Sequence, residues 1–348
     1  MSIQVALKYL VEGRDLSYDD MRAVMSQVMS GDATDSQIGA FLMGLRIKGE
    51  TIDEVTAAAQ VMRDLVAPVT PQSAPLVDLA GTGGDGTNLF NVSTAASIVA
   101  AAGGANVAKH GNRSVSSSSG SSDVLSALGM PLDLDSEQVA RAVDTVGLGF
   151  LFAPAHHSAM RYAVGPRRDM AMRTIFNVLG PLTNPAFAKR QVLGVFAPEL
   201  CEFMAQVLHN LGSEHVLVVH GHGGLDEFSL SGTTKVAELR DGAISTYEVT
   251  PEELGQVRSA LDGLVVHSAA ESAALIKDAL GNKEGEALDR ARAMIAMNAG
   301  AALYVAGCAS SLAKGVALAD DVIATGQAKE RLATFIQLTQ TMKAAESE

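Results

Sequence analysis

The 348-residue sequence has no tryptophan, and aromatic residues make up only 4% of it. Stacking of nucleic acid bases on aromatic side chains is therefore a poor candidate for its function. Basic residues are also outnumbered: 26 lysines and arginines face 39 aspartates and glutamates, a formal net charge of −13. This balance argues against nucleic acid and anionic membranes as partners. A small anionic substrate is still compatible with it, because a few local cations and backbone N–H groups suffice to bind one.

Cysteines and long apolar runs are scarce as well. Cys201 and Cys308 lack the paired spacing of a metal site. They could form one disulfide, but free thiols in a reducing compartment fit better. The sequence has no run of about 20 apolar residues that could span a membrane. The N-terminus, MSIQVALKYLVEGRDL, carries acidic residues early and no long apolar core, unlike a signal peptide. We expect a cytoplasmic protein.

The hydrophobic content of 47% over this length is enough for about two domains. Apolar residues recur at helical spacing from Ser17 to Gly31 and again up to about residue 65. Thr34 with Gln37 and Thr51 with Glu54 have the spacing of capping boxes. The pattern predicts a bundle of helices, followed by a linker, APVTPQSAP, at residues 67–75.

The pattern changes after the linker. A buried strand (LVDLAG), a glycine-rich loop, a helix at 96–104 and a strand (ANVAKHG) predict a βαβ unit. We expect further strands at 191–196 and 215–221, and mostly helices over 267–343 with a capping box at Ser268 and Glu271. The predicted fold is α/β. It combines a small N-terminal all-α domain (1–70, joined in space by part of 165–190) with a large α/β domain (71–348) and a mostly parallel central sheet.

Five glycines lie in the stretch DLAGTGGDGTNLFNVST, residues 78–94, between the predicted strand and helix. Ligands of open α/β sheets bind beyond the carboxyl ends of the strands, and glycines there let N–H groups point at an anion. The stretch matches neither GxGxxG nor GxxxxGK[ST]. A tight turn is the alternative to ligand binding. Asp85 suggests contact with a hydroxyl or a metal, rather than with phosphate.

A second candidate, KHGNRSVSSSSGSSD at residues 109–123, also follows a predicted strand. Lys109 and Arg113 supply positive charge, Asn112 supplies an amide, and the serines supply hydroxyls. A flexible Ser/Gly linker is the alternative. The flanking cations and the helix expected after it favour a loop that closes over a phosphorylated ligand.

Two adjacent carboxylates, Asp226 and Glu227, follow the strand predicted at 215–221. Such a pair can hold Mg²⁺ together with phosphate oxygens and water, although the pair taken alone slightly favours a solvated acidic turn.

The stretch from residue 153 to 185 is rich in histidine and arginine. His156 and His157 lack acidic or cysteine partners at metal-site spacing, which favours ordinary hydrogen-bonded histidines. The stretch also contains four arginines that could bind a carboxylate or a phosphate, one or two of which we expect to be surface residues: Arg161, Arg167, Arg168 and Arg173.

Taken in order, GTGGDG…FNVST, KHGNRSVSS…GSSD, HHSAMRYAVGPRR…RTIFNVLGPLTNP and LDE resemble the anthranilate phosphoribosyltransferase family over nearly the whole chain. The resemblance implies the second step of tryptophan biosynthesis from chorismate. In that step the anthranilate amine takes the phosphoribosyl group of 5-phosphoribosyl 1-pyrophosphate (PRPP), and pyrophosphate leaves. It also implies the nucleoside-phosphorylase-like fold, a homodimer, and Mg²⁺, as two ions.

The same resemblance implies the roles of individual residues. Ser93, Asp226 and Glu227 would hold the metal, and anthranilate would lie among Gly81, Asn112, His157 and Arg167, with His110 helping to shape its pocket. The residues implied for PRPP are Gly81, Gly84, Asp85, Asn91, Val92, Ser93, Thr94, Lys109, His110, Gly111, Asn112, Arg113, Ser114, Val115, Ser116, Ser117 and Ser121. The resemblance implies no acid–base residue or nucleophile, in agreement with the absence of GxSxG and HExxH motifs.

Three residues depart from the family pattern. Ser118 stands where a lysine is usual, Leu89 where a hydroxyl residue is common, and Ala171 where glycine is frequent. A pyrimidine-nucleoside phosphorylase is the nearest alternative on the same fold, and KHGNR with the Arg/His stretch favours anthranilate over it. A fold relative that binds nucleic acid should be basic and lack the Asp–Glu pair.

Overall fold

The chain begins with helices that the sequence specifies locally. In the structure, a computed structural model that describes residues 1–84, 86–113 and 119–345, these are α1 (Ile3–Val11), α2 (Tyr18–Ser30), α3 (Asp35–Lys48) and α4 (Ile52–Asp64). The capping boxes at Thr34 and Thr51 are confirmed. Gly31 ends α2 in the left-handed region, at φ 85°, where glycine has no steric penalty.

A mixed sheet forms the centre of the larger part of the molecule. Within the described chain it has seven strands in the order β3-β2-β1-β4-β5-β6-β7. The first five run parallel, and β6 and β7 pair antiparallel at the edge. The strands are β1 (Leu76–Gly81), β2 (Asn106–Gly111), β3 (Leu148–Phe152), β4 (Arg190–Gly194), β5 (His215–Gly221), β6 (Thr234–Arg240) and β7 (Ala243–Val249).

Strand order reverses between β1 and β4, because the chain runs from β1 outward to β3 and returns on the other side of β1. Such a switch point leaves a crevice at the carboxyl ends of the two strands. The connecting helices are α5 (Val92–Ala102), α6 (Ser121–Leu128), α7 (Ser136–Val146), α8 (Ala153–His156), α9 (Arg161–Met170), α10 (Phe176–Leu179) and α11 (Leu200–Asn210), with 3-10 turns η1 (Ser158–Met160) and η2 (Gly180–Leu182).

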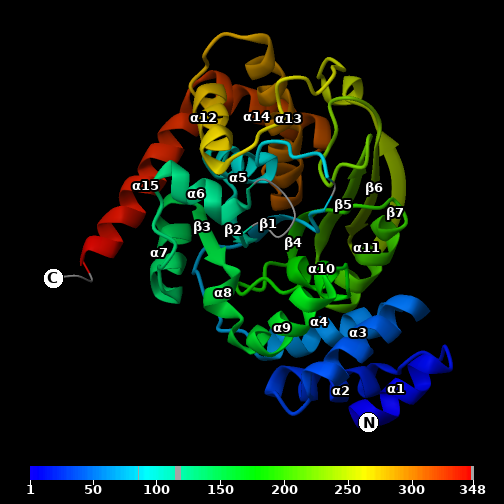
Figure 1. Cartoon of the computed structure of the whole chain (residues 1–348). Helices are drawn as coiled ribbons and strands as arrows, with labels where there is room; N and C mark the ends of the chain where they lie inside the picture. The colour runs from blue at the N-terminus through cyan, green and yellow to red at the C-terminus, as the bar shows by residue number, and fades with distance from the viewer. Residues whose placement is uncertain (85, 114–118, 346–348) are drawn as a thin grey trace.

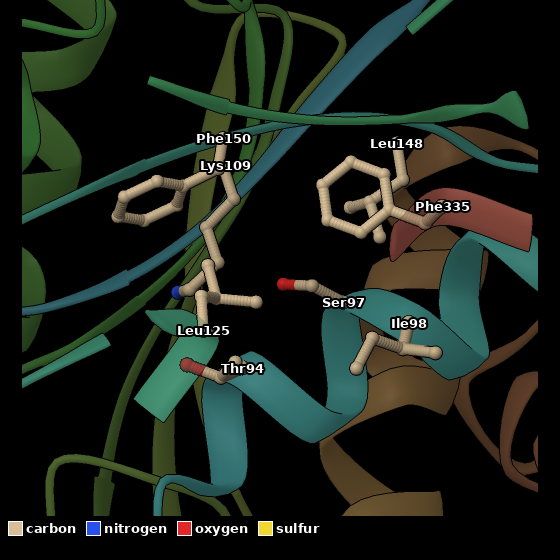
Figure 2. Close-up of a pocket in the computed structure, with 8 residues that line it drawn as sticks. All are labelled: Thr94, Ser97, Ile98, Lys109, Leu125, Leu148, Phe150 and Phe335. Atoms are coloured by element: carbon tan, nitrogen blue, oxygen red, sulfur yellow. The ribbon is translucent and has the colours of Figure 1, made fainter. Parts of the chain in front are cut away.

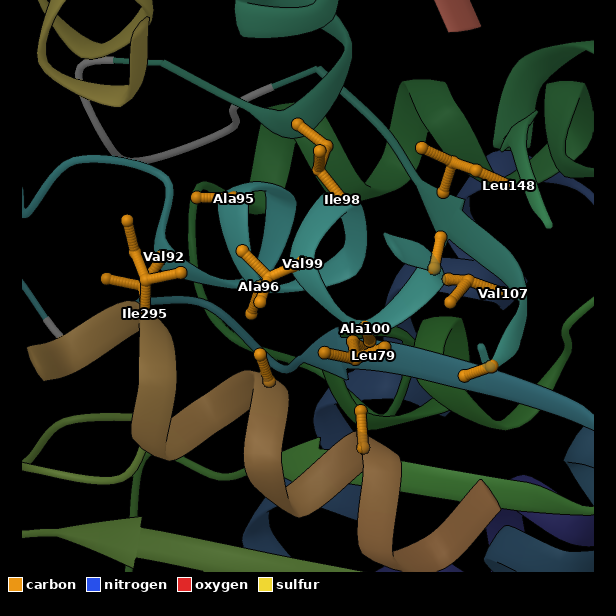
Figure 3. Packing of buried hydrophobic residues seen from close by; sticks show 14 of the residues in the cluster. Leu79, Val92, Ala95, Ala96, Ile98, Val99, Ala100, Val107, Leu148 and Ile295 are labelled. Atoms are coloured by element: carbon orange, nitrogen blue, oxygen red, sulfur yellow. The ribbon is translucent and has the colours of Figure 1, made fainter. Parts of the chain in front are cut away.

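One face of the sheet is covered by α5 and by the C-terminal helices. After the 3-10 turn η3 (Glu252–Leu254), these are α12 (Ala269–Leu280), α13 (Glu286–Ala306), α14 (Leu312–Ala324) and α15 (Gln327–Ala345). Figure 3 shows α5 between Leu79 and Val107 of the sheet and Ile295 of α13. The small side chains of α5, such as Ala96 and Ala100, let it lie buried between two layers.

The other face shares its core with the N-terminal helices. The hydrophobic cluster that begins in α1–α4 continues through α10 and α11 to sheet residues such as Leu193, Val216 and Val218. Figure 1 shows α1–α4 at one end of the molecule, with α9 beside α4 and with α10 on the side toward the sheet. The small all-α domain and the larger α/β domain with its mostly parallel sheet confirm the predicted fold class.

Several local expectations differ from the structure. Helix α5 begins at Val92, four residues before the expected start, and strands β3, β6 and β7 were not predicted. At α12, Ser268 caps the helix, but the Glu271 side chain accepts from the N–H of His267, so the capping box is incomplete. The expected linker is anchored: the N–H groups of Ala67 and Val69 donate to the carbonyls of His156 and Pro185.

Both cysteines are free thiols, with Cys201 buried and Cys308 exposed. Among the described residues, no helix combines the length and the apolar character needed to cross a membrane.

Candidate functional site

The glycine-rich loop lies at the switch point between β1 and β4. Gly83, Gly84 and Gly86 adopt φ values of 66°, 77° and 73°, which disfavour other residues. The N–H of Gly83 donates to Oδ2 of Asp226 over 2.8 Å. At Gly81 a Cβ would lie 2.4 Å from the same carboxylate oxygen. The loop therefore needs glycine both for its turn and for the close approach of an acidic side chain.

Asp226 and Glu227 lie in the loop after β5 and face two different elements. The backbone at Asp226 lies so close to the end of β4 that a Cβ at Gly194 would overlap its carbonyl oxygen, at 1.6 Å. Oε1 of Glu227 accepts from the N–H of Ser93, in the first turn of α5, over 3.1 Å. The fold thus brings the acidic pair between the glycine-rich loop and the N-terminus of α5, two stretches predicted to bind PRPP.

Asn298 holds the loop that carries the acidic pair, and sequence reasoning missed it. Its side chain accepts from the N–H of Phe228 over 2.9 Å and donates to the carbonyls of Phe228 and Met294. The available signal was a single amide in the apolar run MIAMNAGAALYVA, which forms most of α13. A buried amide in such a run needs partners.

Lys109 is a buried cation at the centre of the site, 2% exposed on β2. Its Nζ donates to the carbonyl of Leu79 over 2.5 Å and to Oγ of Ser93 over 3.2 Å. Figure 2 shows it reaching from the strand toward α5, with Thr94 and Ser97 on the facing side. Burial lowers the pKa of Lys109, whereas Asp78, Glu227 and Asp226 act in the other direction. Within the described chain no carboxylate oxygen lies within 4 Å of its Nζ.

Asp78, which sequence reasoning also missed, lies beside Lys109 on β1. It is 1% exposed, and its Oδ1 accepts from the N–H of His110 over 3.0 Å. Burial raises the pKa of Asp78 to about 6, against the opposing effect of the Lys109 charge. The charge of Asp78 therefore acts on Lys109, although no direct ion pair joins them in the described chain.

Two histidines predicted for the site lie together. The rings of His110 and His157 have centroids 5.1 Å apart, and within the described chain neither Nε2 has a hydrogen-bond partner. Burial, followed by the neighbouring His157 and His156, holds the pKa of His110 well below its usual value. Burial, followed by His156, lowers the pKa of His157 to about 4. Both imidazoles are neutral near pH 7.

His156 has a structural role instead. Its Nδ1 lies 3.2 Å from the carbonyl of Ala67, so it anchors the linker, in agreement with the expectation of an ordinary hydrogen-bonded histidine.

The four arginines of the Arg/His stretch separate into different environments. Arg167, half-buried on α9, lies over the Phe176 ring, and burial lowers the pKa of its guanidinium. No carboxylate of the described residues pairs with it, and no hydrogen bond joins it to Asn112 or His157 there. Arg168 pairs with Asp169 at the surface, and Arg161 lies over the Tyr162 ring.

Arg173 reaches the glycine-rich loop, although the resemblance gave it no role. It donates to the carbonyl of Gly84 and lies over the ring of Phe196. It therefore supports the loop from the segment that follows α9.

Other predicted residues occupy the rim of the site. Asn91 precedes α5, Asn112 and the exposed Arg113 follow β2, and Ser121 begins α6. A Cβ on Gly111 would lie 2.7 Å from the Phe150 ring. The remaining predicted residues lie outside the described part of the chain: Asp85, Ser114, Val115, Ser116 and Ser117, together with Ser118.

Comparisons with known proteins bear on the whole chain. Residues 73–329 match the model of the glycosyl transferase family a/b domain, and residues 4–66 match that of its helical bundle domain. The anthranilate phosphoribosyltransferase of Ectopseudomonas mendocina is 56% identical over 99% of both chains. The crystal structure of the Thermus thermophilus enzyme has a TM-score of 0.90 at 42% identity, covering 96% of this chain and 99% of the other.

The anthranilate phosphoribosyltransferase of Saccharomyces cerevisiae is also similar. Its structure in complex with PRPP and Mg has a TM-score of 0.87 at 27% identity, and its structure with 4-fluoroanthranilate has the same score at 26% identity. Both cover 97% of this chain and 98% of the yeast chain.

Proposed function

The chain belongs to the anthranilate phosphoribosyltransferase family, and from this premise we propose a role for each residue of its site. The protein transfers the phosphoribosyl group of PRPP to the amine of anthranilate, in tryptophan biosynthesis. N-(5-phosphoribosyl)anthranilate and pyrophosphate are the products. The observation that carries the residue assignment is Lys109, a buried cation that makes no direct ion pair in the described chain and lies beside the N-terminus of α5.

PRPP binds at the switch point, between the glycine-rich loop and the start of α5. Lys109 and the N–H groups of the first turn of α5 face its phosphates, an arrangement suited to anions. The proposed contacts are Gly81, Gly84, Asn91, Val92, Ser93, Thr94, Lys109, His110, Gly111, Asn112, Arg113 and Ser121, together with Asp85, Ser114, Val115, Ser116 and Ser117 outside the described residues.

Asp226, Glu227 and Ser93 are the proposed Mg²⁺ ligands. No group of three or more His, Cys, Asp or Glu side chains among the described residues could hold a metal ion alone. The donor set nevertheless fits Mg²⁺, which commonly takes one or two carboxylates and completes its shell with phosphate oxygens and water. Asp226 faces the glycine-rich loop and Glu227 faces α5, which supports two ion positions. Bound Mg²⁺ would neutralise the charge of the departing pyrophosphate.

Arg167 binds the anthranilate carboxylate. It is half-buried without a carboxylate partner in the described chain, so an incoming carboxylate would restore its charge balance. His110 and His157, neutral and apolar on their ring faces, shape the pocket beside it together with Gly81 and Asn112.

The chemistry requires little from acid–base groups. The neutral aniline nitrogen attacks the anomeric carbon as the bond to pyrophosphate breaks, and the nitrogen then loses its proton. The residues hold the two substrates in line and stabilise the leaving group.

A homodimer is the proposed assembly. Val5 of α1, Met43 and Ile47 of α3 and Val164 of α9 are exposed apolar side chains at the helical end of the molecule. Because α3 packs against both α1 and α9, a second copy could cover these positions together. An Ile47→Glu variant should shift sedimentation toward the monomer. A cytoplasmic location stays a prediction.

The decisive experiment follows anthranilate fluorescence with the purified protein, PRPP and Mg²⁺. We expect loss of fluorescence that requires all three components and falls sharply in Arg167→Ala and in the double variant Asp226→Asn/Glu227→Gln. Arg168→Ala is the matched control, because Arg168 pairs at the surface. Full activity of the double variant would refute the proposed metal ligands.

A further inference from the structure

Asn91 is positioned by residues from two distant parts of the chain. It precedes α5, where an asparagine side chain would ordinarily accept from its own helix, but it makes no such cap. Instead Oδ1 of Asn91 accepts from Oγ of Ser119 and from Oγ of Ser272, each over 2.9 Å. Its Nδ2 donates to the carbonyl of Ser119 over 3.2 Å.

Ser272 binds both the backbone and the side chain of Asn91, whereas the hydrogen bonds of Ser119 reach the side chain alone. Its hydroxyl also accepts from the N–H of Asn91 over 3.0 Å, and the residue is fully buried on α12. The segment before α12 lies along the loop before α5: Phe90 donates to the carbonyl of Leu264, and Val266 donates to that of Asn88. The C-terminal helical layer therefore fixes the start of α5 at several points.

The hydrogen-bond partners of Asn91 determine the orientation of its carboxamide. A backbone carbonyl only accepts, so the amide nitrogen must face Ser119, and the oxygen must face the two hydroxyls. Both lone pairs of Oδ1 are then used. One of the two Nδ2 protons has no partner within the described residues and is available to a bound ligand.

We propose that Ser272 is a positioning residue for PRPP binding, which it serves by holding the Asn91 carboxamide so that one amide proton is presented to a phosphate oxygen of PRPP. The inference rests on the proposed role of Asn91. Ser272 itself touches no substrate. Its removal would free the carboxamide to rotate and would leave the N–H of Asn91 without its acceptor.

The test is a double-mutant cycle on Asn91→Ala and Ser272→Ala, with KM for PRPP, KM for anthranilate and kcat measured for each variant. We expect Ser272→Ala to raise KM for PRPP about 10-fold, the size of one lost hydrogen bond to a charged group, with KM for anthranilate unchanged. In the Asn91→Ala background, Ser272→Ala should have a much smaller effect on KM, because only the bond from the backbone N–H of residue 91 is left to lose. Thr339→Val is the control, since it removes another fully buried hydroxyl, which donates only to carbonyls of its own helix, α15, among the described residues.

An unchanged KM for PRPP in Ser272→Ala, or an equal rise in both backgrounds, would overturn the proposal. If Ser272→Ala does not fold, Ser119→Ala tests the same carboxamide through its other hydroxyl, with the same two outcomes. Activity of the wild type distinguishes failure of the proposed function from failure of this inference. If the wild type does not convert PRPP and anthranilate, the proposed function fails. If it does, the variants test only the role of Ser272.

Discussion

Two buried lysines, one in the helical domain and one in the site, have opposite surroundings. Lys48, at the end of α3, has a side chain 4% exposed and donates to Asp15 over 2.7 Å and to Glu54 over 2.9 Å. Burial lowers its pKa, but the hydrogen bonds to the two carboxylates outweigh burial and raise the pKa overall. Lys109 has a carbonyl and a hydroxyl as partners, and burial lowers its pKa.

The difference between the two lysines distinguishes a charge that stabilises the fold from a charge that is available to a ligand. Glu54 binds Lys48 and also accepts from the N–H groups of Leu16 and Thr51, so every charge in that cluster has a partner within the fold. A buried charge without a close counter-ion is costly, and one that persists suggests a ligand that completes it. Lys109 makes no direct ion pair in the described chain, and we propose that the phosphates of PRPP supply such a partner.

Replacement of Lys109 should have the largest effect on activity. We expect Lys109→Met to lower kcat/KM for PRPP by about 1,000-fold, the range for loss of a preorganised electrostatic group. The free energy of unfolding should fall by less than in Lys48→Met, about 1–2 kcal/mol, because Asp78 loses a nearby positive charge but no direct ion pair. Steady-state kinetics and urea unfolding measure the two effects. If Lys109→Met were strongly destabilised but had normal kinetics, Lys109 would have a structural role like that of Lys48.

Replacement of Lys48 should give the reverse result. Lys48→Met leaves Glu54 buried without its cation, which should cost about 3–5 kcal/mol of unfolding free energy. The activity per folded molecule should stay within about twofold. Adding Glu54→Gln to Lys48→Met should recover part of the stability, because the amide keeps an acceptor without the charge. If the single variant unfolds like the wild type, Lys48 is not the balanced cation described above.

His157 extends the comparison of buried charges, because its burial in the site keeps it uncharged near pH 7. The pKa of His157 is about 4 in the folded protein, below its usual value of 6.5. Between these values the unfolded chain binds more protons, so this residue lowers stability as the pH falls. Its contribution should be about 2 kcal/mol between pH 7 and pH 5. His157→Asn should therefore lose less stability over this interval than the wild type, in urea titrations at both pH values.

Arg167 is expected to give the smallest effect; it is a second cation that has no carboxylate partner among the described residues. Arg167→Lys keeps the charge but loses the planar, two-pronged geometry. We expect KM for anthranilate to rise about 10-fold, or about 1.4 kcal/mol, while KM for PRPP changes little. Arg168→Lys, at a surface pair, should change neither constant. A rise in KM for PRPP alone would place Arg167 with the phosphates instead.

Local signals carried most of the fold that could be predicted. The capping boxes of α3 and α4 depend on residues three apart, and the βαβ unit depends on one short stretch, so both could be read from sequence. The β6–β7 hairpin had a signal that was overlooked: Asp241 and Gly242 form its turn at φ 52° and 78°, the values of an Asp-Gly hairpin turn.

The residues that position the site through long-range contacts could not be predicted in this way. Lys109 and the Asp226–Glu227 pair belong to motifs with obvious chemistry. Asp78, Asn298 and Ser272 instead act through contacts with residues 32, 70 and 181 positions away in the chain. Nothing in their neighbours distinguishes them, because their partners are brought to them only by the folded sheet and the helices that cover it.

The hydrophobic cluster that runs from α1–α4 through α11 to the sheet has a consequence for how this protein can be recombined with its relatives. The two family models divide the chain between residues 66 and 73, which suggests an exchangeable module. The cluster crosses that boundary through side chains such as Met204 and Leu208 of α11. A chimera joined at residue 70 would therefore mismatch one packed interior, whereas an exchange that includes α11 would keep more of it intact.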